Sequence, residues 1–185
     1  MVFPSLETQR LFLTELRGDD EADLFLLFSN PSVVAYYDLD VFREFSQAAN
    51  LINLFKLRYE EQQGIRWAIR LKSSGQLLGT CGYNSWSSKM RNAVIGYDLL
   101  PEFWRQGYTS EAVRAIISAG FAGALPCGKL HRIQADTVPG NHASELLLLR
   151  LGFKEEGIRR ECGYWKNKFH DLKCFGLLSS EFSTT

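Results

Sequence analysis

The segment from Gly96 to Ile117 limits most strongly what this chain can fold into. A strand-like run ends at Leu99 and Leu100, Pro101 bounds a turn, and the chain then passes through Gly107 into a helix. Such a junction leaves several backbone N–H groups at the start of the helix without partners. Those donors and the positive end of the helix dipole form an anion site suited to a diphosphate. The sequence therefore predicts a strand–turn–helix unit that binds a cofactor carrying a diphosphate.

Four consecutive backbone amides of this turn are the expected donors: those of Gln106, Gly107, Tyr108 and Thr109. Arg105 precedes them, and its guanidinium can pair with a phosphate. Two alternatives stay open at this point. Arg105 can be a solvated surface arginine, and the turn can be an ordinary helix start.

The composition restricts the class of protein. A chain of 185 residues is one domain's worth and can bury a substantial core without disulfides. Its 21 basic and 21 acidic residues cancel, which argues against broad attraction to nucleic acid or an anionic membrane. The 4 cysteines form no C-x-x-C pair, so no metal site is expected. With no secretory signal and no apolar run of about 18 residues, we expect a cytoplasmic domain spanning residues 1–185.

Hydrophobic periodicity predicts alternating strands and helices. Asp19 and Asp20 offer caps for the first helix, which Asn30 and Pro31 end, and residues 86–90 read as a turn. The expected strands are 11–16, 67–71, 77–83, 93–99, 130–138, 153–160 and 172–178, and the expected helices are 23–28, 46–61, 107–124 and 141–151. This order predicts an α/β fold (α+β in some usages) with a mixed sheet between helices.

Further motifs extend the argument over essentially the whole chain. Residues 139–144 read Pro-Gly-Asn-His-Ala-Ser, and residues 151–157 read Leu-Gly-Phe-Lys-Glu-Glu-Gly. With the segment from 96 to 113, the opening Leu-Glu-Thr-Gln-Arg-Leu at 6–11 and the closing His-Asp at 170–171, they resemble the RimJ/RimL-type branch of the GNAT N-acetyltransferases. The resemblance implies a single GNAT-like domain whose twisted mixed sheet has splayed central strands. It also implies acetyl-CoA as cosubstrate and transfer of an acetyl group to a primary amine.

The same resemblance assigns roles to individual residues. In this branch an asparagine at the position of Asn141 bonds the pantetheine arm, although Asn141 can equally be a helix cap. A serine at the position of Ser144 lies near the cofactor sulfur and is the expected general acid; the alternative is a surface serine. A strand amide near Leu99 is expected to hold the oxyanion, and Leu99 and Leu100 are expected to bind the cofactor. The position of Arg105 is usually glycine in this branch.

The general base is less clear from the sequence. Many relatives carry glutamate where this chain has Val94, and others use a carboxylate where it has Gly163. Glu161 is the nearest carboxylate to that second position and is the candidate base. Four further candidates remain: Asp98, Asp136, His170 and Asp171.

The acceptor is open as well. The resemblance favours the α-amino group of a protein N-terminus, a ribosomal protein being the precedent. The alternatives are a small amine, such as a polyamine or aminoglycoside, and a catalytically weak CoA-binding sensor. A monomer and a homodimer are both compatible with the sequence. Five aromatic residues in expected loops or strand ends can line an acceptor pocket: Tyr36, Tyr37, Trp86, Tyr164 and Trp165.

Overall fold

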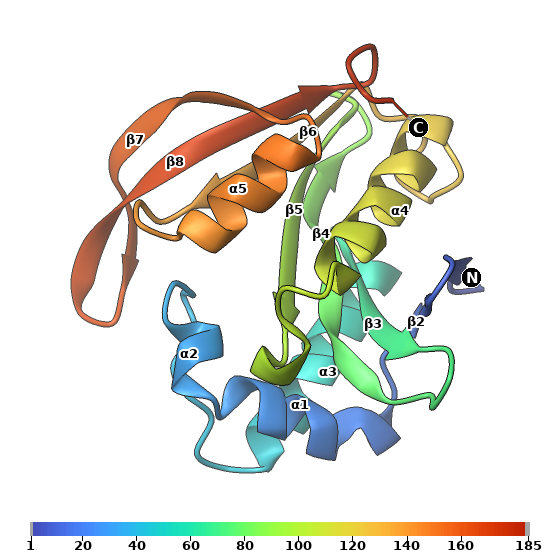
Figure 1. Ribbon diagram of the computed structural model, residues 1–185, viewed down its shortest axis with the longest axis vertical. Helices are drawn as coiled ribbons and strands as arrows, with labels where there is room; N and C mark the ends of the chain where they lie inside the picture. Colours follow the sequence, from blue (N-terminus) through green and yellow to red (C-terminus); the bar gives the residue numbers. More distant parts are fainter. Residues whose placement is uncertain (1, 184–185) are drawn as a thin grey trace.

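The computed structural model describes residues 2–183, which form an eight-stranded sheet with helices on both faces (Figure 1). The strands are β1 (Leu6–Glu7), β2 (Leu11–Glu15), β3 (Ile65–Leu71), β4 (Leu77–Ser87), β5 (Asn92–Leu99), β6 (Arg132–Thr137), β7 (Lys154–Trp165) and β8 (Lys168–Leu178). The helices are α1 (Glu21–Phe28), α2 (Pro31–Val34), α3 (Ser46–Glu60), α4 (Tyr108–Ala122) and α5 (His142–Arg150), with single 3-10 turns at Gly18–Asp20 and Pro101–Phe103.

The two central strands separate along their length. The strands are ordered β1-β2-β3-β4-β5-β6-β8-β7, and the β5–β6 pair is parallel. Strand β5 pairs with β6 only from Asn92 opposite Arg132 to Val94 opposite Gln134. Beyond those residues β5 stays with β4 as far as Leu99, while β6 continues along β8. The predicted mixed sheet with splayed central strands is therefore confirmed.

Apolar residues cover both faces of the sheet, since successive strand residues point to opposite sides. On one face Ile95 of β5 packs in a cluster with Ile116 of α4 and Leu148 of α5. On the other face Ala68 of β3 packs in a second cluster with Leu27 of α1 and residues of α3. Burial on both sides fixes the register of the strands, because a slip by one residue would exchange the two faces.

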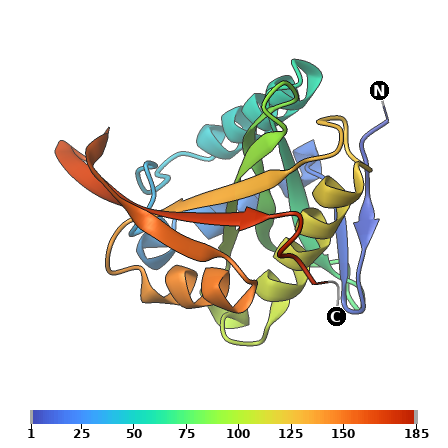
Figure 2. The same ribbon diagram turned by 90° about the horizontal axis from the view of Figure 1, so that it is seen from above.

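Strands β7 and β8 form a hairpin that projects from the body of the protein (Figure 2). Nearly every residue of β7 is exposed. The pairing shifts register twice, between Glu155 and Gly157 and between Arg159 and Gly163. Such bulges bend and twist a strand, so the hairpin arches away from the sheet (Figure 1).

The structure corrects several predicted boundaries. Strand β4 continues to Ser87, so Trp86 belongs to a strand and not to a turn. Asn30 does follow the end of α1, but its side chain also caps α2 by accepting from the Ser32 amide. Strands β7 and β8 are longer than predicted because they pair with each other in solvent. Among residues 2–183, no helix is both long and apolar enough to cross a membrane.

Candidate functional site

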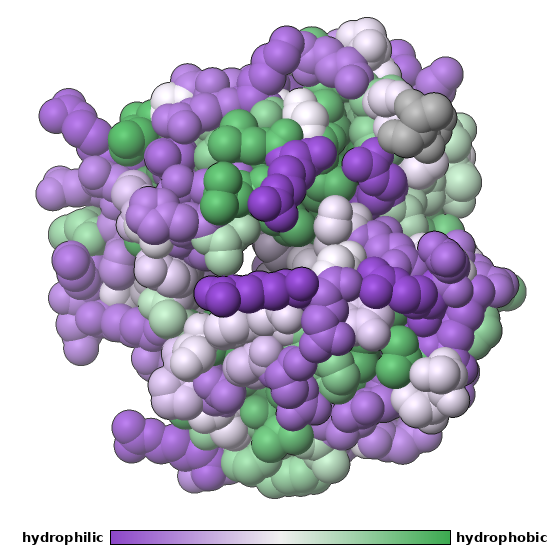
Figure 3. All heavy atoms as spheres, in the orientation of Figure 1, coloured by the Kyte–Doolittle hydropathy of each residue, from purple (hydrophilic) through white to green (hydrophobic). Residues whose placement is uncertain are grey.

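The molecular surface is hollowed at the centre of the face shown in Figure 3, between α5 and the loop that precedes α4. Strand β5 runs behind this hollow in the same orientation (Figure 1). The hollow thus lies over the strand that parts from β6. We call the space between β5 and β6 beyond Val94 and Gln134 the opening.

The backbone of β5 directs polar groups into the opening. The Leu100 N–H donates to the Leu78 carbonyl of β4 at 2.8 Å. Because alternate residues of an antiparallel strand face its partner, Leu99 directs its N–H and C=O groups away from β4. Its carbonyl accepts from Trp104 Nε1 at 2.7 Å. The Leu99 amide faces the open side, where a thioester oxygen can accept from it.

The loop between β5 and α4 has an unusual backbone. Arg105 has a φ of 60°, a left-handed conformation that costs a residue with a Cβ about 1–2 kcal/mol. Gly107 has a φ of 81° and is the N-cap of α4. Glycine is therefore the natural residue for both positions, and an arginine occupies one of them. The side chains of Arg105 and Gln106 are exposed.

The start of α4 presents free backbone donors. The first helical bond runs from the Glu111 N–H to the Gly107 carbonyl at 3.0 Å. The amides of Tyr108, Thr109 and Ser110 precede that bond and have no acceptor within the helix. The N-cap, Gly107, contributes no side-chain cap. This arrangement fits an anionic group such as a diphosphate.

Ser144 of α5 meets Tyr97 of β5 across the opening. The Ser144 hydroxyl lies 2.6 Å from the Tyr97 hydroxyl. The Ser144 N–H donates to Oδ1 of Asn141 at 3.3 Å, which makes Asn141 the N-cap of α5. Burial raises the pKa of Tyr97 to about 12, although the hydrogen bond with Ser144 acts in the opposite direction. Tyr97 therefore stays protonated at neutral pH and can donate to Ser144.

Glu161 lies on the projecting hairpin. It occupies the second bulge of β7, has a φ of 48° and is exposed. Its N–H donates to an Asp171 carboxylate oxygen at 2.8 Å. Glu161, Asp171 and Arg160 line an open depression. The structure thus places the candidate base in solvent, paired with the neighbouring strand.

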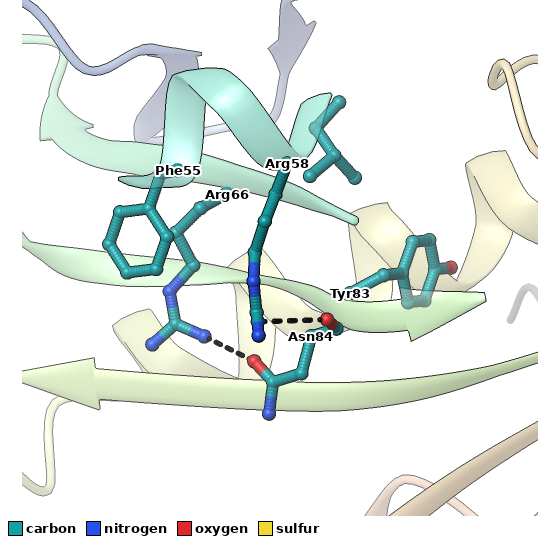
Figure 4. Close-up of a pocket in the computed structure, with 6 residues that line it drawn as sticks. Phe55, Arg58, Arg66, Tyr83 and Asn84 are labelled. Atoms are coloured by element: carbon teal, nitrogen blue, oxygen red, sulfur yellow. Dashed lines mark hydrogen bonds between the residues drawn. The ribbon is translucent and has the colours of Figure 1, made fainter. Parts of the chain in front are cut away.

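Asp98 is fully engaged on the opposite face of β5 from Tyr97. Its carboxylate accepts from the Thr80 amide at 3.0 Å, from the Tyr37 hydroxyl at 2.9 Å and from the Arg66 guanidinium. Figure 4 shows Arg66 reaching from this network toward Asn84, to which it donates at 3.1 Å. A buried carboxylate with this many donors is a structural anion, so Asp98 is not available as a base.

The remaining base candidates also have partners. Asp136 pairs with Arg159, and His170 stacks on Trp165 with ring centroids 4.1 Å apart.

The other aromatic residues expected at an acceptor pocket separate into two groups. Tyr37 is held in the network around Asp98, and Trp86 is partly buried against the core. Tyr36 and Tyr164 are exposed, and Tyr36 donates to the Gly140 carbonyl at 3.1 Å, beside Asn141.

Two parts of this geometry were missed by the sequence reasoning. Tyr97 was quoted only as part of a motif, yet it meets Ser144. Arg10 was also only part of a motif, yet it contacts the loop before α4. The alternation of β5 could have placed Tyr97 on the same face as Ile95. Within residues 2–183, no group of three or more His, Cys, Asp or Glu side chains could hold a metal ion.

Comparison with known proteins places this geometry in a family. The profile described as "Acetyltransferase (GNAT) domain" matches residues 10–154. The protein named "Uncharacterized N-acetyltransferase YoaA" of Bacillus subtilis (strain 168) is 37% identical over 96% of this chain and 98% of its own length. The "Uncharacterized N-acetyltransferase p20" of Bacillus licheniformis is 34% identical over 97% and 98%. A solved structure of RimL, a ribosomal L7/L12 α-N-protein acetyltransferase in complex with coenzyme A, has a similar fold, with a TM-score of 0.81 and 19% sequence identity. The superposition covers 95% of this chain and 98% of the RimL chain.

Proposed function

This chain belongs to the GNAT acetyltransferase family and is an acetyl-CoA-dependent N-acetyltransferase; we propose that its acceptor is the α-amino group of a protein N-terminus. The observation that supports the donor site is the opening between β5 and β6, with free amides at one end and the Tyr97–Ser144 pair across it. Acetyl-CoA supplies an acyl group activated as a thioester. We further propose that the enzyme works in the cytoplasm.

In this proposal the diphosphate of the donor binds the amides of residues 106–109, and Arg105 adds one exposed charge. The pantetheine arm lies in the opening, where Asn141 and the β5 backbone offer hydrogen bonds. The Leu99 amide faces the opening and is suited to hold the oxyanion. Among the amides of residues 106–109, those of Tyr108 and Thr109 precede the first helical bond and have no acceptor within α4, which supports the fit of a diphosphate here.

The Ser144 hydroxyl is the proposed proton donor to the leaving sulfur. Because Tyr97 remains protonated, it can donate to the Ser144 oxygen, and in that arrangement the Ser144 hydrogen is free to point elsewhere. Glu161 is the first candidate for the base, but it is exposed and its backbone N–H is bonded to Asp171. An exposed site for the acceptor amine also allows the proton to leave to water. We therefore propose Ser144 as the acid and assign Glu161 a smaller effect.

The shape of the acceptor side favours a polymer over a small amine. Small ligands bind in enclosed pockets that bury most of their surface. We propose that the acceptor approaches along the hairpin, where Glu161 and Asp171 line an open depression and β7 is almost entirely exposed. A peptide terminus can reach such a place while the rest of its chain stays in solvent. RimL, which has the same fold, is described as an α-N-protein acetyltransferase of ribosomal L7/L12, which is an acceptor of this kind.

An amine panel tests the acceptor. Release of free thiol from acetyl-CoA is followed with peptides that begin with Ser, Ala or Met, with polyamines and with aminoglycosides. The same peptides carrying a blocked N-terminus but a free lysine are the matched control. We expect acetylation at the N-terminal amine, located by mass spectrometry, and none of the blocked peptides. Faster turnover of a polyamine or an aminoglycoside than of every peptide contradicts the proposed acceptor.

A further inference from the structure

The turn between β1 and β2 is hydrogen-bonded to the first turn of α4. The Glu111 carboxylate accepts from the Thr8 hydroxyl at 2.6 Å, from the Arg10 amide at 2.8 Å and from Arg10 Nε at 2.7 Å. These partners are about one hundred residues apart in the chain. Three donors on one carboxylate fix the position of Glu111, and with it the start of α4, relative to the N-terminal strands.

Arg10 also reaches the loop that precedes α4. Its Nη1 donates to the Gln106 carbonyl at 3.0 Å. Its guanidinium carbon lies 4.3 Å from the centre of the Tyr108 ring, within the range of a cation–π contact. Its Nη2 would lie 3.3 Å from a Cβ added to Gly107. One side chain therefore lies against three consecutive residues, Gln106 and Gly107 of the loop and Tyr108 at the start of α4.

The loop needs such support because its backbone is strained. Arg105 and Gly107, on either side of Gln106, both have positive φ. A left-handed residue other than glycine persists only when its surroundings hold it. The hydrogen bond from Arg10 to the Gln106 carbonyl holds the peptide between these two residues.

Arg10 also neutralises the negative charge of Glu111, which would otherwise oppose a diphosphate. Partial burial raises the pKa of Glu111, but the hydrogen bonds from Thr8 and Arg10 outweigh it, so that this pKa lies below the usual value. Glu111 is therefore ionised at neutral pH, one turn inside a helix start that is expected to receive an anion. A carboxylate there repels a diphosphate unless a cation neutralises it, and Arg10 forms that ion pair.

We propose that the turn formed by Thr8 and Arg10 is a working part of the donor site: Arg10 is a positioning residue that sets the backbone of residues 105–107 for the diphosphate and cancels the charge of Glu111. The proposal rests on the proposed diphosphate site at the start of α4. It adds the turn with Thr8 and Arg10, which lies near the N-terminus, to the donor site. This turn does not itself need to touch the cofactor.

Two acetyl donors separate this role from general support of the fold. Acetyl-CoA carries the diphosphate, whereas S-acetylpantetheine lacks it. The ratio of kcat/KM between variant and wild type is measured for each donor with the best amine of the panel above. The variants are Arg10→Ala, Arg10→Lys and the double variant Arg10→Ala with Glu111→Gln. Lys72→Ala is the matched control, because it also removes a cation that forms an ion pair with an acidic residue of the N-terminal strands, Glu7 of β1.

We expect Arg10→Ala to lower kcat/KM for acetyl-CoA by about tenfold or more, the scale of a lost hydrogen bond to a charged group, mainly through KM. S-acetylpantetheine should change by less than about twofold, as should both donors with Lys72→Ala. Arg10→Lys should recover only part of the loss, because lysine cannot reproduce the forked contacts. The double variant should recover part of it, because the unpaired charge is gone.

Equal losses with both donors, or no loss with acetyl-CoA, would overturn the proposal. A double variant as weak as Arg10→Ala would contradict the role of the charge. Thermal melting checks that each variant is folded. If Arg10→Ala does not fold, the comparison of the two donors is made with Arg10→Lys. Calorimetric titration with CoA needs no acceptor, so an error in the proposed acceptor leaves this result readable. A wild type that binds no CoA instead refutes the proposed donor site.

Discussion

Replacing Tyr97 with phenylalanine tests the central pair of the proposed site. The change removes one hydroxyl and keeps the ring that packs against the core. Ser144 then loses the partner that lies 2.6 Å away in the wild type, and its hydroxyl is free to rotate. Since Tyr97 is protonated at neutral pH, the lost interaction is an ordinary neutral hydrogen bond.

The size of the effect follows from that bond. A neutral hydrogen bond contributes about 0.5–1.5 kcal/mol, and about 1.4 kcal/mol is a factor of ten in rate. We therefore expect Tyr97→Phe to lower kcat by about three- to tenfold with little change in KM for acetyl-CoA. Ser144→Ala should lower kcat by about ten- to a thousandfold, the range of one acid–base group. The melting temperature of Tyr97→Phe should fall by no more than about 2–4 °C, as expected for about 1 kcal/mol in a chain of this length.

A double-mutant cycle supplies the decisive comparison. If Tyr97 acts through Ser144, then Tyr97→Phe has no further effect on kcat once Ser144 is alanine. Tyr59→Phe is the control, because it also removes one tyrosine hydroxyl, which donates to the Val2 carbonyl and has no part in the proposed site, and it should leave kcat unchanged. Full additivity of the two losses, or an unchanged kcat in Tyr97→Phe, would refute the argument.

Three further results are expected. Asp98→Ala leaves the buried Arg66 charge unpaired and should destabilise the fold by about 3–5 kcal/mol in chemical denaturation, whereas a loss below about 1 kcal/mol would show that the network around Asp98 is dispensable. Glu161→Gln should leave the acidic limb of the pH–rate profile in place, because Glu161 is exposed; disappearance of that limb would identify Glu161 as the base after all. The pKa of Glu111 is lowered from 4.5 in the folded protein, so this carboxylate stabilises the fold above pH 4.5, and the stabilisation is lost as the pH falls through the lower folded pKa. The melting temperature of Glu111→Gln should therefore fall less on acidification than that of the wild type. Equal falls in melting temperature would contradict the assignment.

Local sequence signals predicted most of the fold but not its lengths. Hydrophobic periodicity identified β3, β5 and β6, and the predicted helix 141–151 ends at the C-cap of α5, Leu151, just before Gly152 with its φ of 93°. The hairpin of β7 and β8 extends beyond its predicted ends because backbone pairing, not burial, defines it. Helix α2 is a single turn, and Pro31 at its first position could have been recognised as a helix start as easily as a helix stop.

The sequence likewise predicted the local part of the candidate site but not its long-range contacts. The free amides at the start of α4 follow from a local turn, so the sequence alone indicated them. The contact of Tyr97 with Ser144 and that of Arg10 with Glu111 join residues 47 and 101 positions apart. No periodicity carries such information, because it depends on how far β5 and β6 diverge and on where the N-terminal strands pack. Arg105 is a different case: glycine suits a left-handed backbone best, and the structure shows an arginine in that conformation.

Calorimetric titration of acetyl-CoA into the wild type and into Gly107→Pro tests the account most directly. Proline fixes φ near −65° and removes an amide donor, whereas Gly107 has a φ of 81° and caps α4. Gly75→Pro is the matched control, since Gly75 has a φ of 75° in the turn between β3 and β4. The wild type and Gly75→Pro should bind the donor, Arg105→Ala should bind it somewhat more weakly, and a folded Gly107→Pro should not bind it measurably. Equal affinity of Gly107→Pro and the wild type would contradict the claim that the backbone at the start of α4 holds the diphosphate.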